Sequence, residues 1–149
     1  YVLGKTFRDD GANSQIMQPY FEIPNLHFVG HVDGEEKASY LKRAKLLINT
    51  SIHEALPISF LEALSYGTLI VSNRNPENLT EKFGIHVGDV LGDGFDKVGL
   101  YCDAVSKLMN DDILQEQLAV KAIQYINEVH NVEKFVKNTR KIILQETAQ

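Results

Sequence analysis

The chain has 149 residues, of which 44% are hydrophobic, and a formal net charge of −5 at pH 7. This length suits one compact domain, and the hydrophobic content argues against a disordered chain. The acidic balance argues against a general nucleic-acid binder, which would present a basic face.

From Tyr1 to Gly88, short apolar runs alternate with helical periodicity, which is typical of βα units with parallel strands. The predicted strands are 1–4, 26–30, 45–50, 68–73 and 85–88. The predicted helices between them are 13–20, 35–43 and 57–66, the last with Pro57 in its first turn. Right-handed crossovers place such helices on both faces of a sheet. We therefore predict a doubly wound, mostly parallel α/β fold that binds ligands at the carboxyl ends of its strands.

The C-terminal third is predicted to be helical, in the segments 95–110, 113–129 and 132–147. A Gly-rich segment, 88–97, is the one candidate for a long loop. The last helix carries an apolar stripe at helical spacing, formed by Val132, Phe135, Val136, Thr139, Ile142 and Ile143. The cationic residues of this helix lie mostly outside the stripe, so we expect one face to be packed and the other to be exposed to solvent.

Glu62 is the only formally charged residue among the nineteen that separate Glu54 from Arg74. An ionised carboxylate held against apolar packing costs several kcal/mol unless it is paired or hydrogen-bonded. A ligand is one candidate for its partner. The alternative is a helix-surface carboxylate at the edge of the domain.

Glu54 falls in the loop after the third predicted strand, and Glu62 falls inside the helix that follows. The N-terminus of that helix offers unpaired N–H groups and a partial positive charge, which suit a phosphate or sugar oxygens. Carboxylates at these positions can accept hydrogen bonds from sugar hydroxyls or from a vicinal diol, each worth about 1.5 to 3 kcal/mol. A simpler interpretation of Glu54 is that its negative charge stabilises the N-terminus of the helix.

Three segments then occur in order: LHFVGHV, SIHEALPISFLEAL and YGTLIVSN. Together they resemble the nucleotide-sugar half of group 1 (family 4) glycosyltransferases of the GT-B fold. The match runs from Tyr1 to about Gly88, and the helical remainder is similar in layout to the end of such enzymes. The resemblance implies that residues 1–149 are a Rossmann-like C-terminal donor-binding domain. It also implies that the chain is a fragment lacking the N-terminal acceptor domain.

The resemblance assigns a donor site, position by position. It makes Glu54 the catalytic residue beside the donor sugar, and it places Glu62 on the ribose of the nucleotide. The other donor-binding residues that it implies are Gly30, His31, Leu56, Ile58, Ser59 and Phe60. The first two would flank the base, and the rest would lie at the helix mouth near the sugar and phosphates. For His31, a hydrogen-bonded structural histidine is the competing reading.

The chain departs from the family pattern in places. Pro57 removes one possible amide donor, and Asn-Arg-Asn-Pro at 73–76 replaces the usual Gly-Gly pair. The Arg and Lys that neutralise the leaving diphosphate in the family precede the first strand seen here, and neither Lys5 nor Arg8 matches them. We therefore expect this chain alone to bind donor without turnover.

The implied activity is retaining transfer of a hexosyl group from a UDP-, GDP- or ADP-sugar to a glycan or lipid-linked acceptor, as in polysaccharide biosynthesis. No metal or other cofactor is implied. The acceptor would bind the missing N-terminal domain. The alternatives are a non-catalytic nucleotide-sugar or partner-binding α/β module and a sugar-nucleotide epimerase or hydrolase of the same fold. A receiver-type signalling domain is disfavoured because the third predicted strand ends in Asn49-Thr50-Ser51 without a phosphoacceptor Asp.

Cys102 is the only cysteine, which excludes an internal disulfide and indicates a reducing compartment. We expect its thiol in the core. No stretch approaches 18 consecutive apolar residues, and the N-terminus lacks the regions of a signal peptide. The expected location is cytoplasmic, with membrane contact at most peripheral, at the inner membrane face.

Overall fold

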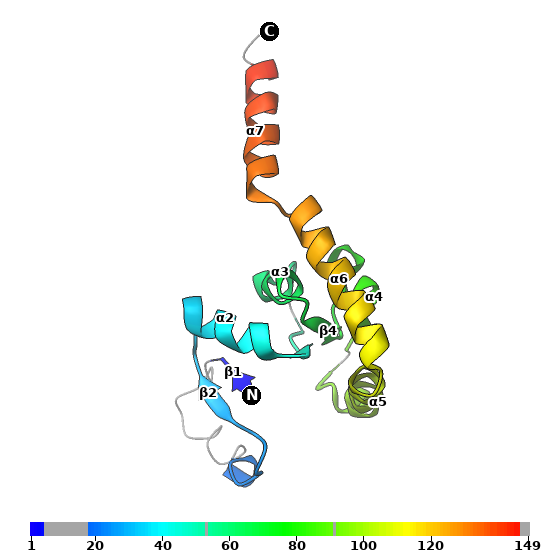
Figure 1. Cartoon of the computed structure of the whole chain (residues 1–149). Helices are drawn as coiled ribbons and strands as arrows, with labels where there is room; N and C mark the ends of the chain where they lie inside the picture. The colour runs from blue at the N-terminus through cyan, green and yellow to red at the C-terminus, as the bar shows by residue number, and fades with distance from the viewer. Residues whose placement is uncertain (5–17, 53, 91, 147–149) are drawn as a thin grey trace. The chain divides into compact units, whose positions relative to one another are not determined.

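A computed structural model describes residues 1–4, 18–52, 54–90 and 92–146. The chain divides into two compact units, Tyr1–Tyr40 (unit 1) and Leu41–Gln149 (unit 2). Figure 1 shows helices α2 to α7 and strands β1, β2 and β4 with their labels.

Unit 1 contains a two-stranded parallel sheet made of β1 (Val2–Leu3) and β2 (Phe28–Gly30). The predicted strands at 1–4 and 26–30 are therefore confirmed, in shorter form. Of the helix predicted over 13–20, residues 13–17 lie outside the described residues, and η1 (Gln18–Tyr20) is a 3₁₀ turn. Aromatic contacts help to hold this unit together: the Tyr1 ring lies 4.9 Å from the ring of His27 and 5.1 Å from that of Tyr40.

Helix α2 (Gly34–Arg43) begins in unit 1, and local chemistry explains both of its ends. Asp33 Oδ1 accepts a hydrogen bond from the Gly34 N–H at 2.8 Å, which satisfies one of the unpaired amides of the first turn. Acidic residues occupy the first turn and basic residues the last, which complements the helix dipole.

Unit 2 is built on a three-stranded parallel sheet with the order β3-β4-β5. The strands are β3 (Leu46–Asn49), β4 (Leu69–Ser72) and β5 (Gly84–His86). Helix α3 (Ile58–Ser65) connects β3 to β4, while η2 (Pro76–Asn78) and α4 (Leu79–Lys82) connect β4 to β5. The α/β class with parallel strands is thus confirmed. Helix α4 was not predicted because its four residues are too few for periodicity to detect.

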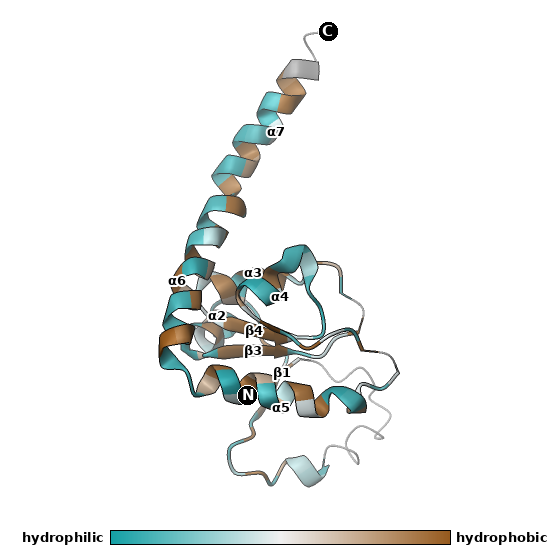
Figure 2. Cartoon of the chain, turned by 90° about the vertical axis from the view of Figure 1, so that its right-hand side faces the viewer, coloured by the Kyte–Doolittle hydropathy of each residue, from teal (hydrophilic) through white to brown (hydrophobic). Residues whose placement is uncertain are grey.

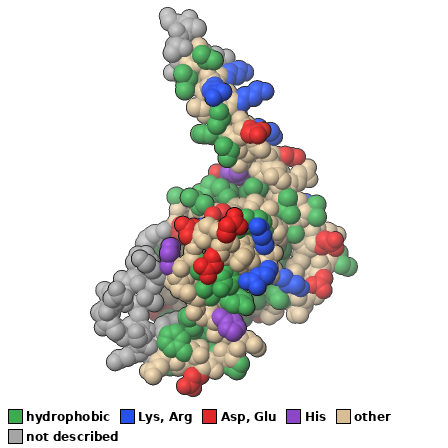
Figure 3. Space-filling view, turned by 60° about the vertical axis from the view of Figure 1, so that its left-hand side comes forward, with side chains coloured by type: hydrophobic (Ala, Val, Ile, Leu, Met, Phe, Trp, Pro, Cys, Tyr) green, Lys and Arg blue, Asp and Glu red, His purple; other side chains and the backbone are tan. Residues whose placement is uncertain are grey.

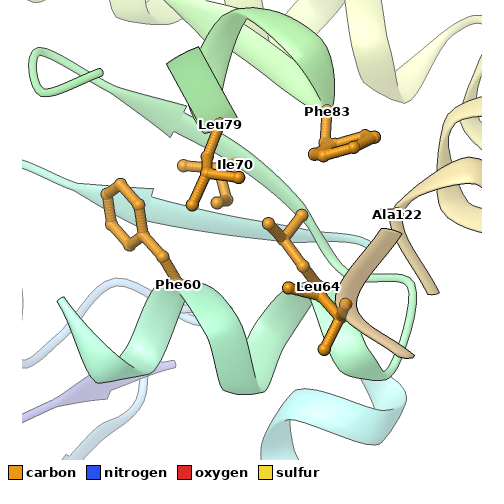
Figure 4. Packing of buried hydrophobic residues seen from close by; sticks show 7 residues of the cluster. Phe60, Leu64, Ile70, Leu79, Phe83 and Ala122 are labelled. Atoms are coloured by element: carbon orange, nitrogen blue, oxygen red, sulfur yellow. The ribbon is translucent and has the colours of Figure 1, made fainter. Parts of the chain in front are cut away.

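Strand β4 is buried along its whole length, which its apolar sequence favours. Ile70 points to one face of the sheet, where it packs with Phe60, Leu64, Leu79, Phe83 and Ala122 (Figure 4). Leu69 and Val71 point to the opposite face and pack with residues of α5 (Val98–Met109). Figure 2 shows α3 and α4 on one side of the strands and α5 on the other. The two-residue alternation of β4 therefore builds a core on each face of the sheet.

The C-terminal part of unit 2 is helical, as predicted. The segment 95–110 forms η3 (Phe95–Lys97) followed by α5, and α6 (Asp112–Val129) and α7 (Val132–Glu146) complete the chain. Asp111 caps α6 by accepting a hydrogen bond from the Leu114 N–H at 2.9 Å.

Two expectations about this region are wrong. Cys102 is exposed rather than in the core, because it lies on a face of α5 away from the buried Ala104 and Leu108. The apolar stripe of α7 is not packed: Val132 is 74% exposed and Phe135 70%. Helical periodicity identified α7 as a helix, but the stripe meets no covering element in the described part of the chain.

Candidate functional site

The candidate site lies where β3 ends and α3 begins. Asn49, the last residue of β3, turns the chain by accepting a hydrogen bond from the Ser51 N–H through Oδ1 at 3.2 Å, and its Nδ2 donates to Ser51 Oγ at 3.3 Å. Such turns are a local property of Asn side chains. The loop then leads to Glu54, which is half-buried.

The N-terminus of α3 is set by Pro57. This buried residue is the N-cap, with φ −63° and ψ 125°, rather than a first-turn residue as predicted. Its carbonyl accepts the Phe60 N–H at 2.9 Å. The N–H groups of Ile58 and Ser59 belong to the first turn, where an α-helix offers no acceptor of its own. The arrangement therefore leaves amides at the helix mouth for an anion or a sugar oxygen.

Glu62 lies on α3 one turn beyond Ile58 and Ser59, on the side of the helix that they share. Its side chain is half-buried, and Oε2 itself is shielded from solvent. The opposite side of α3 carries Phe60 and Leu64, both 0% exposed, into the core. Core packing on one side of α3 thus fixes the position of Glu62 on the other.

The predicted site residues have different surroundings. Ile58 is 72% exposed, whereas Leu56 and Ser59 are half-buried. The Phe60 side chain is a core residue and its N–H is already donated, so a direct donor contact by Phe60 has no support in this geometry. The structure brings these residues together with Glu54 and Glu62 on one loop and helix of unit 2.

Gly30 and His31 belong to unit 1, whereas the other predicted site residues belong to unit 2. Both are exposed. Gly30 has φ +83°, a conformation that favours glycine, and a Cβ built there would meet nothing within 4 Å. Near His31, the Gly34 N–H and the Lys37 ammonium hold the pKa of the Asp33 carboxyl below its usual range.

A polar network that no sequence pattern predicted lies at the carboxyl ends of β3 and β4. Tyr101 of α5 is its centre: the Tyr101 hydroxyl donates to the Asn49 carbonyl at 2.7 Å and accepts the Asn73 N–H at 3.0 Å. Asn73, 1% exposed, donates through Nδ2 to the Ser51 carbonyl at 3.2 Å. Burial raises the pKa of the Tyr101 phenol, which the Asn73 N–H partly offsets. The network ties the loop after β3 to the end of β4.

Arg74 extends this connection to Glu54. Its Nη2 donates to the Glu54 carbonyl at 3.2 Å, and its Nη1 lies 4.0 Å from Asp89 Oδ1. Polar residues at strand ends were the only sequence signal for this network, since nothing in the helical pattern of α5 distinguishes Tyr101.

Among the described residues, no group of three or more His, Cys, Asp or Glu side chains is placed to hold a metal ion. In the same part of the chain, no helix is long and apolar enough to cross a membrane.

Comparison with known protein families identifies the family of this chain. No curated protein sequence matches the chain. The family profile described as Glycosyl transferases group 1 matches residues 16–125, which is more than half of the chain and includes β3, α3 and β4. This chain therefore belongs to the group 1 glycosyltransferases, a family whose function is glycosyl transfer.

Proposed function

We propose that this chain is the donor-binding domain of a retaining glycosyltransferase that moves a hexosyl group from a nucleotide-sugar to a glycan or lipid-linked acceptor. Another domain of the same enzyme would bind the acceptor. The donor would be a UDP-, GDP- or ADP-sugar, with no metal required. The protein would act in the cytoplasm, in polysaccharide biosynthesis.

One observation carries the proposal: Glu54, the free mouth of α3 and Glu62 occur together at the carboxyl edge of a parallel sheet. Ligands of open α/β sheets bind at this edge. The first-turn amides of Ile58 and Ser59 suit the diphosphate, because they combine unpaired N–H groups with the positive end of the helix dipole.

The two carboxylates differ in what surrounds them, and this supports different roles. Glu62 projects from a helix whose other side is fixed in the core, so it suits a ribose diol, which needs an acceptor of constant position. Glu54 lies on the loop after β3, at the edge where the sugar would sit, and it suits the sugar hydroxyls at the reacting end of the donor.

The test is binding of nucleotides by the 149-residue chain and by a Glu62→Gln variant. We expect the chain to bind one of UDP, GDP or ADP, and the variant to bind it about tenfold or more weakly, because a charge-assisted hydrogen bond is lost. Glu116→Gln is the matched control, since Glu116 is an exposed glutamate of α6.

Equal nucleotide affinity in the two variants would contradict the ribose assignment. A separate assay concerns turnover: if the chain alone transfers sugar from a nucleotide-sugar to an acceptor, the proposal of a second, acceptor-binding domain is wrong.

A further inference from the structure

We propose that Arg74 is a positioning residue that holds the Glu54 loop in the conformation needed to bind the sugar of the donor. The inference rests on the proposed function and adds to it. The family resemblance gave no role to Arg74, which stands in a segment where the chain departs from the family pattern.

The contact that carries the inference joins two loops. The Arg74 guanidinium, on the loop after β4, donates through Nη2 to the Glu54 carbonyl oxygen, on the loop after β3, at 3.2 Å. The two residues are twenty positions apart in the chain. A hydrogen bond to a backbone carbonyl leaves the Glu54 carboxylate unoccupied by this contact, so Arg74 orients the loop without competing for a ligand.

The backbone that carries the guanidinium is itself fixed. The Arg74 N–H donates to Ser72 Oγ at 2.9 Å, and the Arg74 carbonyl accepts Thr80 Oγ1 at 2.6 Å. Ser72 and Thr80 are both 0% exposed. Arg74 therefore reaches Glu54 from a buried, hydrogen-bonded base, which is the arrangement that keeps a site residue in one geometry.

The competing explanation is that Arg74 simply pairs with Asp89. Arg74 Nη1 lies 4.0 Å from Asp89 Oδ1, and the Asp89 side chain is 77% exposed. An ion pair of this kind contributes little, because solvent screens it. The hydrogen bond to the Glu54 carbonyl is shorter and involves a charged donor, so it is the stronger determinant of the Arg74 conformation.

This placement predicts a selective effect. Glu54 is assigned to the sugar, whereas Glu62 and α3 are assigned to the nucleotide. If Arg74 acts through the Glu54 loop, its loss weakens the part of the affinity that comes from the sugar and leaves the affinity for the free nucleotide nearly unchanged.

The experiment compares Kd values for nucleoside diphosphates and their sugars by NMR titration of the 149-residue chain. The probes are UDP and UDP-glucose, GDP and GDP-mannose, and ADP and ADP-glucose. The variants are Arg74→Met, which removes every donor, and Arg74→Lys, which keeps the charge and a donor. Arg140→Met, at an exposed residue of α7, is the matched control.

We expect Arg74→Met to weaken binding of the nucleotide-sugar about tenfold and that of the free nucleotide less than twofold, with partial recovery in Arg74→Lys. Arg140→Met should change neither Kd. Equal loss for both ligands, or no loss for either, would overturn the inference.

A second measurement does not depend on a ligand. Removal of the Glu54 restraint should shift the NMR signals of the amides at 54–56 and speed their hydrogen exchange in Arg74→Met, while the amides of β4 keep their protection. Unchanged loop amides would overturn the positioning role. If the loop amides change but no probe binds the unmodified chain, the proposed function fails and the restraint by Arg74 stands.

Discussion

Helices α3 and α7 look alike in sequence, since both carry apolar residues at helical spacing, but the exposure of these residues differs in the structure. In α3, Phe60, Ala63 and Leu64 are 0% exposed, and Phe60 and Leu64 pack with Ile70 of the sheet. In α7, Val132 and Phe135 are at least 70% exposed. Periodicity therefore predicts a helix, while burial depends on a partner that the helix alone does not reveal.

Local interactions define the beginning of α7. Asn131 Oδ1 accepts the Lys134 N–H at 3.0 Å, and Lys134 Nζ donates to the Glu128 carbonyl at 3.0 Å. Figure 3 shows hydrophobic and cationic side chains on different sides of this helix. The difference in burial between α3 and α7 matters for function. Core packing fixes α3, which can therefore hold Glu62 in place, whereas α7 lacks such packing and offers no comparable support.

The largest expected effect comes from a matched pair of phenylalanines. Phe60→Ala removes a ring that is 0% exposed and should lower the free energy of unfolding by about 3 to 5 kcal/mol. Phe135→Ala removes a ring that is 70% exposed and should change it by less than about 0.5 kcal/mol. Urea denaturation measures both. Similar losses in the two variants would mean that α7 is packed in solution.

A second pair tests how closely the strands of unit 2 approach. A Cβ at Gly84 would overlap the Ile70 carbonyl oxygen of the neighbouring strand, so Gly84→Ala should force β4 and β5 apart at a cost of about 1 to 3 kcal/mol. A Cβ at Gly99 of α5 would meet no atom of a neighbouring element within 4 Å, so Gly99→Ala should stabilise the protein by about 0.4 to 1 kcal/mol. Thermal unfolding distinguishes the two. A Gly84→Ala variant of unchanged stability would contradict the described strand spacing.

The Tyr101 hydroxyl provides a third test, in the polar network at the carboxyl ends of β3 and β4. Tyr101→Phe leaves the Asn49 carbonyl and the Asn73 N–H without this partner and should cost about 1 to 3 kcal/mol near neutral pH.

The same hydroxyl predicts a pH dependence. Burial raises its pKa above the usual 10.0, so the folded state binds its proton more tightly than the unfolded state. The resulting contribution to stability is complete below pH 10 and is lost as the pH rises from there through the folded pKa. Stability should therefore fall more steeply above pH 10 in the unmodified chain than in Tyr101→Phe. Parallel pH profiles would contradict the burial of the phenol.

The smallest effects come from two helix caps. Asp111→Ala removes the cap of α6, which packs against the sheet, and should lower the global free energy of unfolding by about 0.5 to 2 kcal/mol. Asn131→Ala removes the cap of α7 and should reduce only the helicity of that segment. Hydrogen exchange resolved by residue separates the outcomes. A global loss in Asn131→Ala would show that α7 is coupled to the core.

The sequence predicted most of this fold because the strands carry strong local signals. The apolar run at β4 and the Pro-preceded helix α3 both appear where they were expected. What it missed depends on contacts between distant residues. Tyr101 is fifty-two positions from Asn49, to which it donates, and no local pattern announces such a pair. The exposure of Cys102 and of the α7 stripe is likewise decided by which elements meet in space.

The residues proposed for the candidate site come from the sequence, but the contacts that hold them in place could not be predicted from it. Glu54 and Glu62 stand out in sequence because they border and interrupt an apolar run. The predicted contact by Phe60 has no support because the periodicity of α3 aims that ring into the core. The sequence did not predict Arg74 as a partner of Glu54, because a hydrogen bond from a side chain to a backbone carbonyl twenty residues away leaves no local pattern.

An NMR chemical-shift map of this chain with UDP-, GDP- and ADP-sugars would locate the donor site. One donor should shift the amides of Glu54, Ile58 and Glu62 and leave those of α7 unchanged. Shifts confined to α7, or no shifts at the β3–α3 edge with any donor, would contradict the assignment of this edge as the donor site.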